Sequence, residues 1–409
     1  MLSNLRALDL TNEKGFLCGK VLAHFGVDVI KIEIPGGDPC RNKGPFYHDI
    51  QDPEKSLYWF AYNDSKKSIT LNLETPEGQD IFRKLVANTD FVIESFPVGY
   101  MDSLGLSYEQ LSSINPKLIM AAITPFGQTG PYKNYKGTDL TAIAMGGIMW
   151  QTGEPDGLPC RLNEDHAYSM AASNAALAMF IANYYREMTG EGQFIDVSIT
   201  ECIMRENYYA VPMAWEIGRH NPRRNGGNMY RGKVNTKAII PCKDGFVEWT
   251  LFGGKVGSHD NKQLADWISV EEITDELKNI DWDQFNFDDI TQEEVNRIES
   301  YIFQLTSRHT KRELEDESFR RGIRLSAVNN MKDLCEGAQL EFRKSLKAVE
   351  HSEIPDVITY IGQLFISNAT KVEIKYRPPL IGEHNKQIYE DELNLDRKTL
   401  DNLRAKGII

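Results

Sequence analysis

Residues 5–33 read LRALDLTNEKGFLCGKVLAHFGVDVIKIE and predict a β-α-β unit. Residues 5–10 form a short apolar run typical of a strand, residues 15–26 have a helical pattern, and residues 27–33 form a second strand. The alternation continues downstream, with further strands expected at 66–73, 89–96 and 117–124. Alternating strands and helices joined by right-handed crossovers give a mostly parallel sheet that is covered on both faces. The predicted fold is therefore α/β and Rossmann-like.

The loop after the first strand argues against a nicotinamide cofactor. Glu33 ends the second strand, where dinucleotide-binding folds carry an acid that holds the ribose. Residues 11–19, TNEKGFLCG, supply Gly15 and Gly19 but no G-x-G-x-x-G, whose glycines let the backbone approach a pyrophosphate. The chain also contains neither a Walker A motif nor the G-x-S-x-G motif of serine hydrolases.

The composition of the chain changes along its length. Residues 1–215 carry the alternating pattern and predict the first part of a large domain. Residues 222–330 predict a smaller α+β domain, with a hairpin that turns at Asp244-Gly245, a dipeptide typical of such turns. The acidic stretch at 271–294 is expected to be a solvated helical face. The C-terminal tail predicts two short helices after a proline-rich entry.

The bulk composition excludes several classes of function. The net charge of -13 over 409 residues disfavours nucleic acids and anionic membranes as partners. The six cysteines contain no CxxC pair and the eight histidines are isolated, so neither a disulfide framework nor a metal site is expected. The N-terminus lacks the apolar core of a signal peptide, and the apolar stretches are too short to span a bilayer. These features predict a cytoplasmic protein that makes no use of a membrane.

Asp165 lies in the sequence NEDHAYSM, directly before a long helical pattern. Aspartate is a favoured N-cap residue, and a helix N-terminus favours its ionised form. An ionised and positioned carboxylate is also what a covalent carboxylate nucleophile requires. Because caps are far more common than nucleophiles, the local sequence by itself favours the structural role.

Two lysine-containing loops leave a choice between a surface turn and a phosphate site. The segment ITPFGQTGPYKNYKGTD is either an exposed turn or a cradle for a phosphate-bearing ligand, with Lys133 or Lys136 as the cation. Lys66 and Lys67 precede a strand and are either surface residues or phosphate contacts. The residue types alone do not decide between these readings.

Several motifs taken together resemble the family III CoA-transferases, the group of formyl-CoA transferase, carnitine CoA-transferase and bile-acid CoA-transferase-like proteins. The combination of FGQTGPY with the later D-H-A-Y-S and R-x-x-T-G-x-G-Q is the most specific part of the resemblance. The matching stretches, in family order, are VIKIEIPGGDPCR, NDSKKSITLNLETPEGQDIF, ESFPVGYMDSLG, FGQTGPY, DHAYSMAASNAALAMF, REMTGEGQ and PPLIGEHNKQIY.

The resemblance implies a CoA-transferase in which Asp165 is the catalytic aspartate. In such enzymes the carboxylate attacks an acyl-CoA thioester and forms an acyl anhydride, and the CoA thiolate then returns to give an aspartyl-CoA thioester. An acceptor carboxylic acid takes over the CoA through a second anhydride. The exchange keeps the free energy of the thioester if water is excluded. The CoA thioester is a substrate, and no tightly bound cofactor is implied.

The resemblance also implies residues that bind CoA. The matching positions are Gly15 in the loop after the first strand, Leu71 and Asn72 at the adenine end, Ser95 and Phe96 beside the CoA chain, Lys136 near the phosphates, and Gly226 and Gly227 in a glycine-rich loop that closes over the aspartate. Ile34 and Ser103 stand where formyl-CoA transferase has arginines. Phosphate binding is therefore expected to depend on other cations, for which the candidates are Arg41, Lys66, Lys67 and Arg231.

Two alternative functions and the assembly also follow from the resemblance. In related α-methylacyl-CoA racemases a G-H-D motif supplies a histidine, but this chain has Thr138 there, which disfavours racemisation. A non-catalytic CoA-binding subunit of a heteromeric transferase is the second alternative. The family implies an interlocked homodimer whose large domain is completed by residues 340–409, with the smaller domain inserted.

Overall fold

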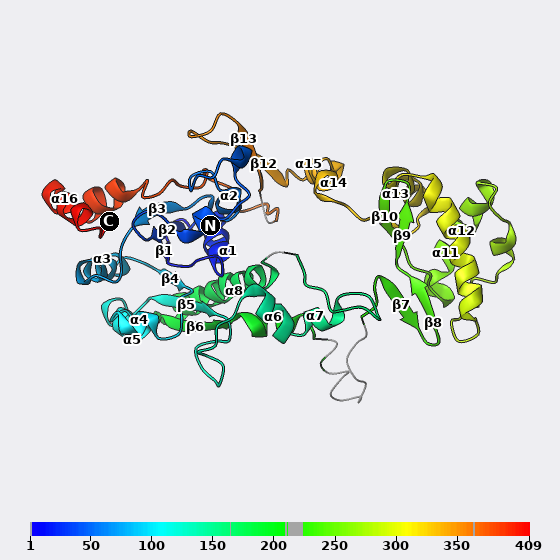
Figure 1. Ribbon diagram of the computed structural model, residues 1–409, viewed down its shortest axis with the longest axis horizontal. Helices are drawn as coiled ribbons and strands as arrows, with labels where there is room; N and C mark the ends of the chain where they lie inside the picture. The colour runs from blue at the N-terminus through cyan, green and yellow to red at the C-terminus, as the bar shows by residue number, and fades with distance from the viewer. Residues whose placement is uncertain (1, 164, 209–210, 212–223, 363–364) are drawn as a thin grey trace. The chain divides into compact units, whose positions relative to one another are not determined.

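The computed structural model describes residues 2–163, 165–208, 211, 224–362 and 365–409 (Figure 1). The chain divides into two compact units. The larger unit contains residues 1–149, 161–220 and 338–409, and the smaller unit contains residues 150–160 and 221–337. The segment 150–160 thus belongs to the smaller unit, although the predicted large domain contained it.

The larger unit is built on a six-stranded parallel sheet with the order β3-β2-β1-β4-β5-β6 (Figure 1). Its strands are β1 (Arg6–Asp9), β2 (Asp28–Glu33), β3 (Lys67–Thr70), β4 (Phe91–Glu94), β5 (Ile119–Thr124) and β6 (Gln193–Ser198). This sheet confirms the predicted α/β fold. The strand order reverses between β1 and β4, and at such a point the loops beyond the carboxyl ends of the strands leave a crevice for a ligand.

Helices cover both faces of the sheet. Successive strand residues point to opposite faces, so Ala7 joins the core under α1 (Phe16–His24) and α8 (His166–Thr189). Leu8 joins the core under α3 (Pro76–Val86), α5 (Tyr108–Ile114) and α16 (Arg397–Ala405). The start of α3 is as predicted, because Thr75 accepts a hydrogen bond from the Gly78 N–H and Pro76 is the first helical residue.

Helix α2 (Leu57–Asn63) is held by a separate hydrophobic cluster of the larger unit. Trp59 and Phe60 of α2 pack with Tyr360 from the hairpin of β12 (Leu346–Glu350) and β13 (Val357–Ile361). Ser56 begins the helix by accepting a hydrogen bond from the Trp59 N–H. This anchoring fixes the direction in which Tyr58 points.

The remaining elements of the larger unit lie in its connections and near its C-terminal end. They are the short helices α4 (Tyr100–Ser103), α6 (Asp139–Met145), α7 (Ile148–Gln151), α9 (Ile199–Arg205) and α15 (Ala338–Phe342), 3-10 turns at Pro39–Asn42 and Tyr47–Asp49, and a π-helical turn at Gln387–Glu392. Helix α7 extends to the start of the smaller unit.

The smaller unit combines two small sheets with helices. Its strands are β7 (Asn228–Arg231), β8 (Val234–Lys237), β9 (Ile239–Cys242), β10 (Gly245–Glu248) and β11 (Ser326–Ala327), and its helices are α11 (Gly254–Val270), α12 (Gln292–Arg308), α13 (Lys311–Arg321) and α14 (Met331–Cys335). The predicted hairpin is confirmed, because Cys242 pairs with Gly245 across the turn.

The acidic stretch at 271–294 was wrongly predicted to be a helical face. It contains only a 3-10 turn at Glu276–Asn279 before α12 begins at Gln292. Leu277, Trp282 and Phe285 from this stretch are buried in the core of the smaller unit. The burial of these apolar side chains therefore decides the conformation of the segment.

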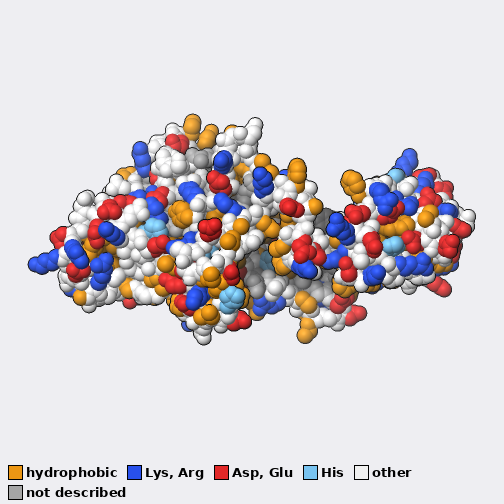
Figure 2. Space-filling view, turned by 90° about the horizontal axis from the view of Figure 1, so that it is seen from above, with side chains coloured by type: hydrophobic (Ala, Val, Ile, Leu, Met, Phe, Trp, Pro, Cys, Tyr) orange, Lys and Arg blue, Asp and Glu red, His pale blue; other side chains and the backbone are white. Residues whose placement is uncertain are grey.

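The surface carries charges of both signs. On the face drawn in Figure 2, acidic and basic side chains are interspersed among polar and scattered hydrophobic ones. Among the described residues, no helix combines the length and the apolar character that crossing a bilayer requires.

Candidate active site

Asp165 occupies the position directly before α8, but its side chain does not cap that helix. Asp139, the first residue of α6, performs this role instead. Its Oδ1 accepts hydrogen bonds from the Ala167 N–H at 2.7 Å and the Tyr168 N–H at 3.1 Å. The first N–H groups of a helix need acceptors, and Asp139 satisfies two of them. The predicted capping role of Asp165 is therefore wrong, and its carboxylate is available for other contacts.

Tyr58 on α2 is the direct partner of the Asp165 side chain. Its hydroxyl donates a hydrogen bond of 2.5 Å to Asp165 Oδ2. Burial, followed by this contact with the Asp165 carboxylate, raises the pKa of Tyr58 far above its ordinary value, so the phenol keeps its proton. Within the described residues, Asp165 Oδ1 accepts no hydrogen bond. One carboxylate oxygen is thus held and the other is open.

A second carboxylate and a lysine lie beside this pair. Glu13, in the loop after β1, contacts Lys43 with Oε1 3.3 Å from Nζ, and the Lys43 Nζ is 5.0 Å from the centre of the Tyr58 ring. Partial burial opposes the charge of Lys43, but the carboxylates of Glu13 and Asp165 outweigh it and raise the pKa of this lysine. These groups favour the protonated form of Lys43, and the Asp165 carboxylate is one of those that raise its pKa.

Cys40 lies in the same corner but is not a nucleophile. Its Sγ donates a hydrogen bond of 2.9 Å to Glu13 Oε2. Burial, and the neighbouring carboxylates of Asp38 and Glu13, raise the pKa of this thiol. The thiolate is the reactive form of cysteine, so this environment keeps Cys40 unreactive.

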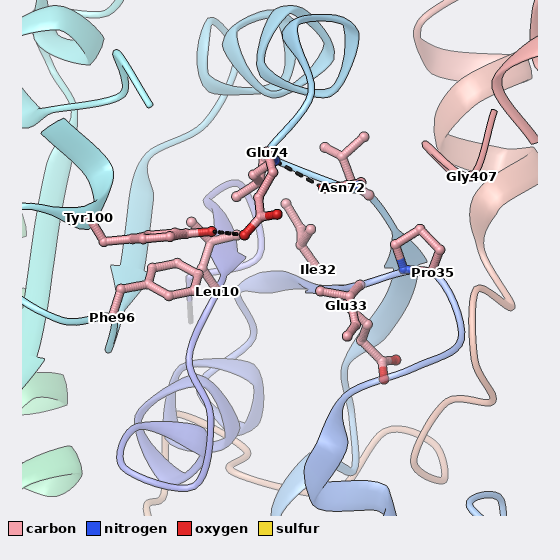
Figure 3. Close-up of a pocket in the computed structure, with 12 residues that line it drawn as sticks. Leu10, Ile32, Glu33, Pro35, Asn72, Glu74, Phe96, Tyr100 and Gly407 are labelled. Carbon is pink, nitrogen blue, oxygen red and sulfur yellow. Dashed lines mark hydrogen bonds between the residues drawn. The ribbon is translucent and has the colours of Figure 1, made fainter. Parts of the chain in front are cut away.

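A cavity of about 410 Å³ opens at the carboxyl ends of β1, β2 and β3 (Figure 3). It brings together three of the predicted CoA-binding residues, Leu71, Asn72 and Phe96, together with Ile34. The other residues that line it are Leu10, Ile32, Glu33, Pro35, Leu73, Glu74, Tyr100 and Gly407. The walls are mainly apolar with a few polar groups, as is typical of ligand pockets.

Hydrogen bonds and ring contacts shape the rim of this cavity. The Tyr100 hydroxyl donates to Glu74 Oε1 at 3.3 Å, and Asn72 Oδ1 accepts from the Glu74 N–H at 3.0 Å (Figure 3). The rings of Phe96 and Tyr100 lie 4.6 Å apart and form one apolar wall.

Ser95 and Gly15 are not among the residues that line the cavity, and they position the loop after β1. Ser95 Oγ accepts from the Asn12 N–H at 2.9 Å and donates to Asn12 Oδ1 at 3.0 Å. A Cβ on Gly15 would lie 2.4 Å from Thr11 Cγ2, so only glycine fits. These contacts fix the loop that carries Glu13.

Arg41 and Lys66 were predicted as phosphate-binding cations, and the structure contradicts both predictions. Lys66 is fully buried, and its three ammonium donors are used by Asp9 Oδ2 at 2.9 Å, Phe16 O at 2.8 Å and Asn63 Oδ1 at 2.8 Å. Arg41 is also buried. Its guanidinium binds Glu33, Glu54 and the Pro379 carbonyl and stacks on Trp59. Both cations are committed to internal contacts.

The other predicted cations occupy different environments. Lys67 pairs with Asp28 at 2.8 Å, and Arg231, in the smaller unit, lies over the Phe252 ring at 5.2 Å. Lys136 is exposed in the loop between β5 and α6 and forms no ion pair with any residue that the structure describes. It remains the candidate for the CoA phosphates.

Gly226 and Gly227 belong to the smaller unit and form a tight turn there. Both have positive φ, 55° and 76°, and the Asn228 N–H closes the turn on the Asn225 carbonyl at 2.8 Å. A Cβ on Gly226 would meet the Glu154 carboxylate at 2.2 Å. Their predicted closure over Asp165 stays a prediction. Glu164, the acidic neighbour of Asp165, lies outside the described residues.

Three residues of this corner were not predicted from the sequence, namely Tyr58, Lys43 and Glu13, and neither was Asp139 as the cap of α8. Asp139 begins α6 and reaches the N-terminus of α8 only in the folded chain. The other three contact Asp165 or each other only through the tertiary fold.

Comparisons with known proteins identify the family of this chain. The family model described as CoA-transferase family III matches residues 2–385. The chain is 31% identical to the succinyl-CoA:(R)-benzylsuccinate CoA-transferase subunit BbsE of Thauera aromatica, covering 100% of this chain and 98% of that protein. It is 27% identical to the formyl-CoA:oxalate CoA-transferase of Streptomyces avermitilis, with coverages of 100% and 99%.

Two further relatives are a human protein and a bacterial protein of known crystal structure. The succinyl-CoA:glutarate CoA-transferase of Homo sapiens is 28% identical, covering 100% of this chain and 90% of that protein. The crystal structure of a CAIB/BAIF family protein from Brucella suis matches with a TM-score of 0.81 at 27% identity, covering 95% of this chain and 98% of that chain. The chain therefore belongs to CoA-transferase family III and is an enzyme that transfers CoA between an acyl-CoA and an acid.

Proposed function

We propose that this enzyme transfers CoA through covalent intermediates on Asp165. The observation that carries the proposal is the Asp165 carboxylate, which does not cap α8: Tyr58 holds Oδ2, and no residue that the structure describes donates a hydrogen bond to Oδ1. Oδ1 attacks the thioester carbonyl of the donor acyl-CoA, the C–S bond breaks, and an acyl-aspartyl anhydride and CoA thiolate form. The thiolate then attacks the aspartyl carbonyl, which releases the donor acid and leaves an aspartyl-CoA thioester.

The second half of the reaction repeats these steps in reverse. The acceptor carboxylate attacks the aspartyl-CoA thioester, giving a new anhydride and CoA thiolate. The thiolate attacks the acceptor's acyl carbon, which forms the product acyl-CoA and regenerates the Asp165 carboxylate. No net proton is consumed, so the site needs no general acid or base for the exchange.

Tyr58 has a defined role in this sequence. When thiolate or carboxylate attacks the aspartyl carbonyl, negative charge develops on its non-bridging oxygen, Oδ2. The Tyr58 hydroxyl already donates to that oxygen at 2.5 Å. A donor that is positioned before the charge develops stabilises such an oxyanion without reorganisation.

The cavity at the carboxyl ends of β1 to β3 supports a binding site for the adenosine end of CoA, with Leu71, Asn72 and Phe96 in its wall. Lys136 contacting a phosphate belongs to the same proposal. The acids named for the three relatives above, benzylsuccinate, oxalate and glutarate, are all dicarboxylic. They support a dicarboxylic acid as the acceptor.

We also propose the interlocked homodimer. Helix α8 exposes a row of large apolar side chains, namely Leu177, Ile181, Tyr184 and Met188, which are 53% to 72% exposed. Apolar patches of this kind typically mark an interaction surface, and a second copy of the chain is the proposed partner.

A non-catalytic subunit of a heteromeric transferase is the second candidate, because one of the relatives is named a subunit. A racemase is disfavoured, since Thr138 uses its hydroxyl to cap α6 and is not a base at neutral pH. The purified chain should exchange CoA between acids by itself. Binding of CoA without exchange, restored by a second polypeptide, would support the heteromer.

Chemical trapping tests the covalent proposal directly. The enzyme is incubated with an acyl-CoA and quenched with hydroxylamine or borohydride, and its peptides are mapped by mass spectrometry. Modification is expected on Asp165 and is expected to disappear in Asp165→Asn. Full transferase activity in the Asp165→Ala variant would overturn the proposal.

A further inference from the structure

We propose that Lys43 binds the second carboxylate of a dicarboxylic acid while its first carboxylate reacts at Asp165. The inference rests on the function proposed above and names the residue that selects the acid. Lys43 would then be a specificity-determining residue that contacts the substrate away from the reacting atoms.

The placement of Lys43 matches this role. The Tyr58 hydroxyl donates a hydrogen bond to Asp165 Oδ2 at 2.5 Å, and the Lys43 ammonium lies 5.0 Å from the centre of the same phenol ring. The carboxylate and the ammonium thus contact the same side chain, one at its hydroxyl and the other at its ring. A dicarboxylic acid bound here would place one carboxylate at Asp165 and the other at Lys43.

Glu13 already demonstrates that a carboxylate fits against this lysine. Its Oε1 lies 3.3 Å from the Lys43 Nζ, and its own pKa is lowered because hydrogen bonds from Cys40 and from its own backbone, together with the charge of Lys43, overcome burial. An ammonium has three donors, so Lys43 can bind the substrate carboxylate beside Glu13 or in exchange for it. The Lys43 side chain is 43% exposed, which leaves it accessible to an incoming acid.

The neighbouring cations of these loops are occupied by other groups. Arg41 binds Glu33 and Glu54 in the interior. Lys14 is half-buried and its Nζ donates to the Ser95 carbonyl at 3.1 Å. Among the described cations of these loops, Lys43 combines an exposed side chain with an electrostatic interaction with Asp165, whose charge helps to raise its pKa.

The test compares two acceptors of equal length that differ in the second carboxylate. The kcat/KM of the full-length enzyme is measured for glutarate and for valerate, with succinyl-CoA as the donor in both cases. A hydrogen-bonded contact to a charged group contributes enough for a roughly tenfold or larger effect. The ratio of the two values is therefore expected to fall at least about tenfold in Lys43→Met. Any effect on the donor cancels in the ratio.

Two further variants make the result specific. Lys43→Arg keeps the charge and is expected to preserve most of the preference for glutarate. Lys55→Met is the matched control, because Lys55 pairs with Asp52 at 3.4 Å. This variant should leave the glutarate-to-valerate ratio of kcat/KM at the wild-type value. An unchanged ratio in folded Lys43→Met, or a wild-type enzyme that accepts valerate as well as glutarate, would overturn the assignment.

The outcomes separate this inference from the proposed function. Trapping on Asp165 together with an unchanged ratio in Lys43→Met would refute only the role of Lys43. Failure to trap an acyl group on Asp165, with no transfer to either acid, would refute both.

Discussion

Replacement of Tyr58 by phenylalanine removes one hydroxyl and leaves the ring that packs beside Lys43. The hydroxyl donates to Asp165 Oδ2 at 2.5 Å in a largely buried setting. A hydrogen bond to a charged group contributes about 1.5–3 kcal/mol, and each 1.36 kcal/mol changes a rate tenfold. If the bond strengthens as charge develops on Oδ2, kcat should fall about 10- to 100-fold. The KM for acyl-CoA should change much less, because Tyr58 does not line the cavity.

A competing effect has the opposite sign. The same bond also stabilises the resting carboxylate, so its loss leaves Asp165 freer to attack the thioester. We expect the oxyanion effect to dominate, because the tetrahedral charge at the aspartyl carbonyl is concentrated on the oxygen that Tyr58 holds. Steady-state CoA transfer, followed by chromatography of the CoA esters, measures the outcome.

A matched variant controls for packing. Tyr360→Phe removes a hydroxyl from the hydrophobic cluster that anchors α2, where it contacts His351 at 2.8 Å. It should lower stability without a comparable loss of kcat. A folded Tyr58→Phe enzyme whose kcat is within about twofold of wild type, or about 0.4 kcal/mol, would refute the assigned role.

Three further predictions test the neighbouring structure. Asp139→Ala removes the acceptor for two N–H groups of α8, so calorimetry should show a loss of about 1 kcal/mol in stability. The kcat should also fall, because Asp165 directly precedes this helix, and an unchanged kcat would contradict a role of Asp139 in positioning Asp165. Phe96→Ala removes one wall of the cavity and should raise the KM for acyl-CoA about tenfold, whereas an unaltered KM would place the adenine elsewhere. Burial raises the pKa of Glu94 to about 7, so the folded state binds the proton more tightly than the unfolded state. The associated stability is present below the unfolded pKa near 4.5 and is lost as pH rises through 7. Thermal unfolding should therefore show that the free energy of unfolding of the wild type falls between pH 5 and 8 by about 2–3 kcal/mol more than that of Glu94→Gln. Parallel pH profiles of the two proteins would contradict this expectation.

The fold was predictable because its main signal is local. Strands buried on both faces appear as continuous apolar runs, and the alternation of these runs with helical patterns predicts the parallel sheet. Thr75 with Pro76, and Asp244 with Gly245, marked a helix start and a turn correctly. The acidic stretch at 271–294 failed because Trp282 and Phe285 are drawn into a core that its charges do not reveal.

The site was only partly predictable because its contacts are not local. Asp165 was identified by resemblance to a family, while its local sequence suggested a helix cap. The cap comes from Asp139 on another helix, and the partner Tyr58 lies 107 residues away in the sequence. Lys66 was predicted to be a phosphate-binding cation, yet three tertiary contacts hold it in the interior. Residue types alone cannot distinguish a buried ion pair from a binding site.

Transfer through covalent intermediates on Asp165 exchanges the oxygen atoms of this carboxylate with those of the substrates. In the proposed sequence the donor acid leaves with an Asp165 oxygen, and the acceptor returns one of its own carboxylate oxygens to that residue. The direct measurement uses an ¹⁸O-labelled acceptor carboxylate, turnover with an acyl-CoA, and the mass of the peptide that contains Asp165. Incorporation of ¹⁸O into the Asp165 carboxylate is predicted. An unlabelled peptide from enzyme that has transferred CoA through many turnovers would contradict the account.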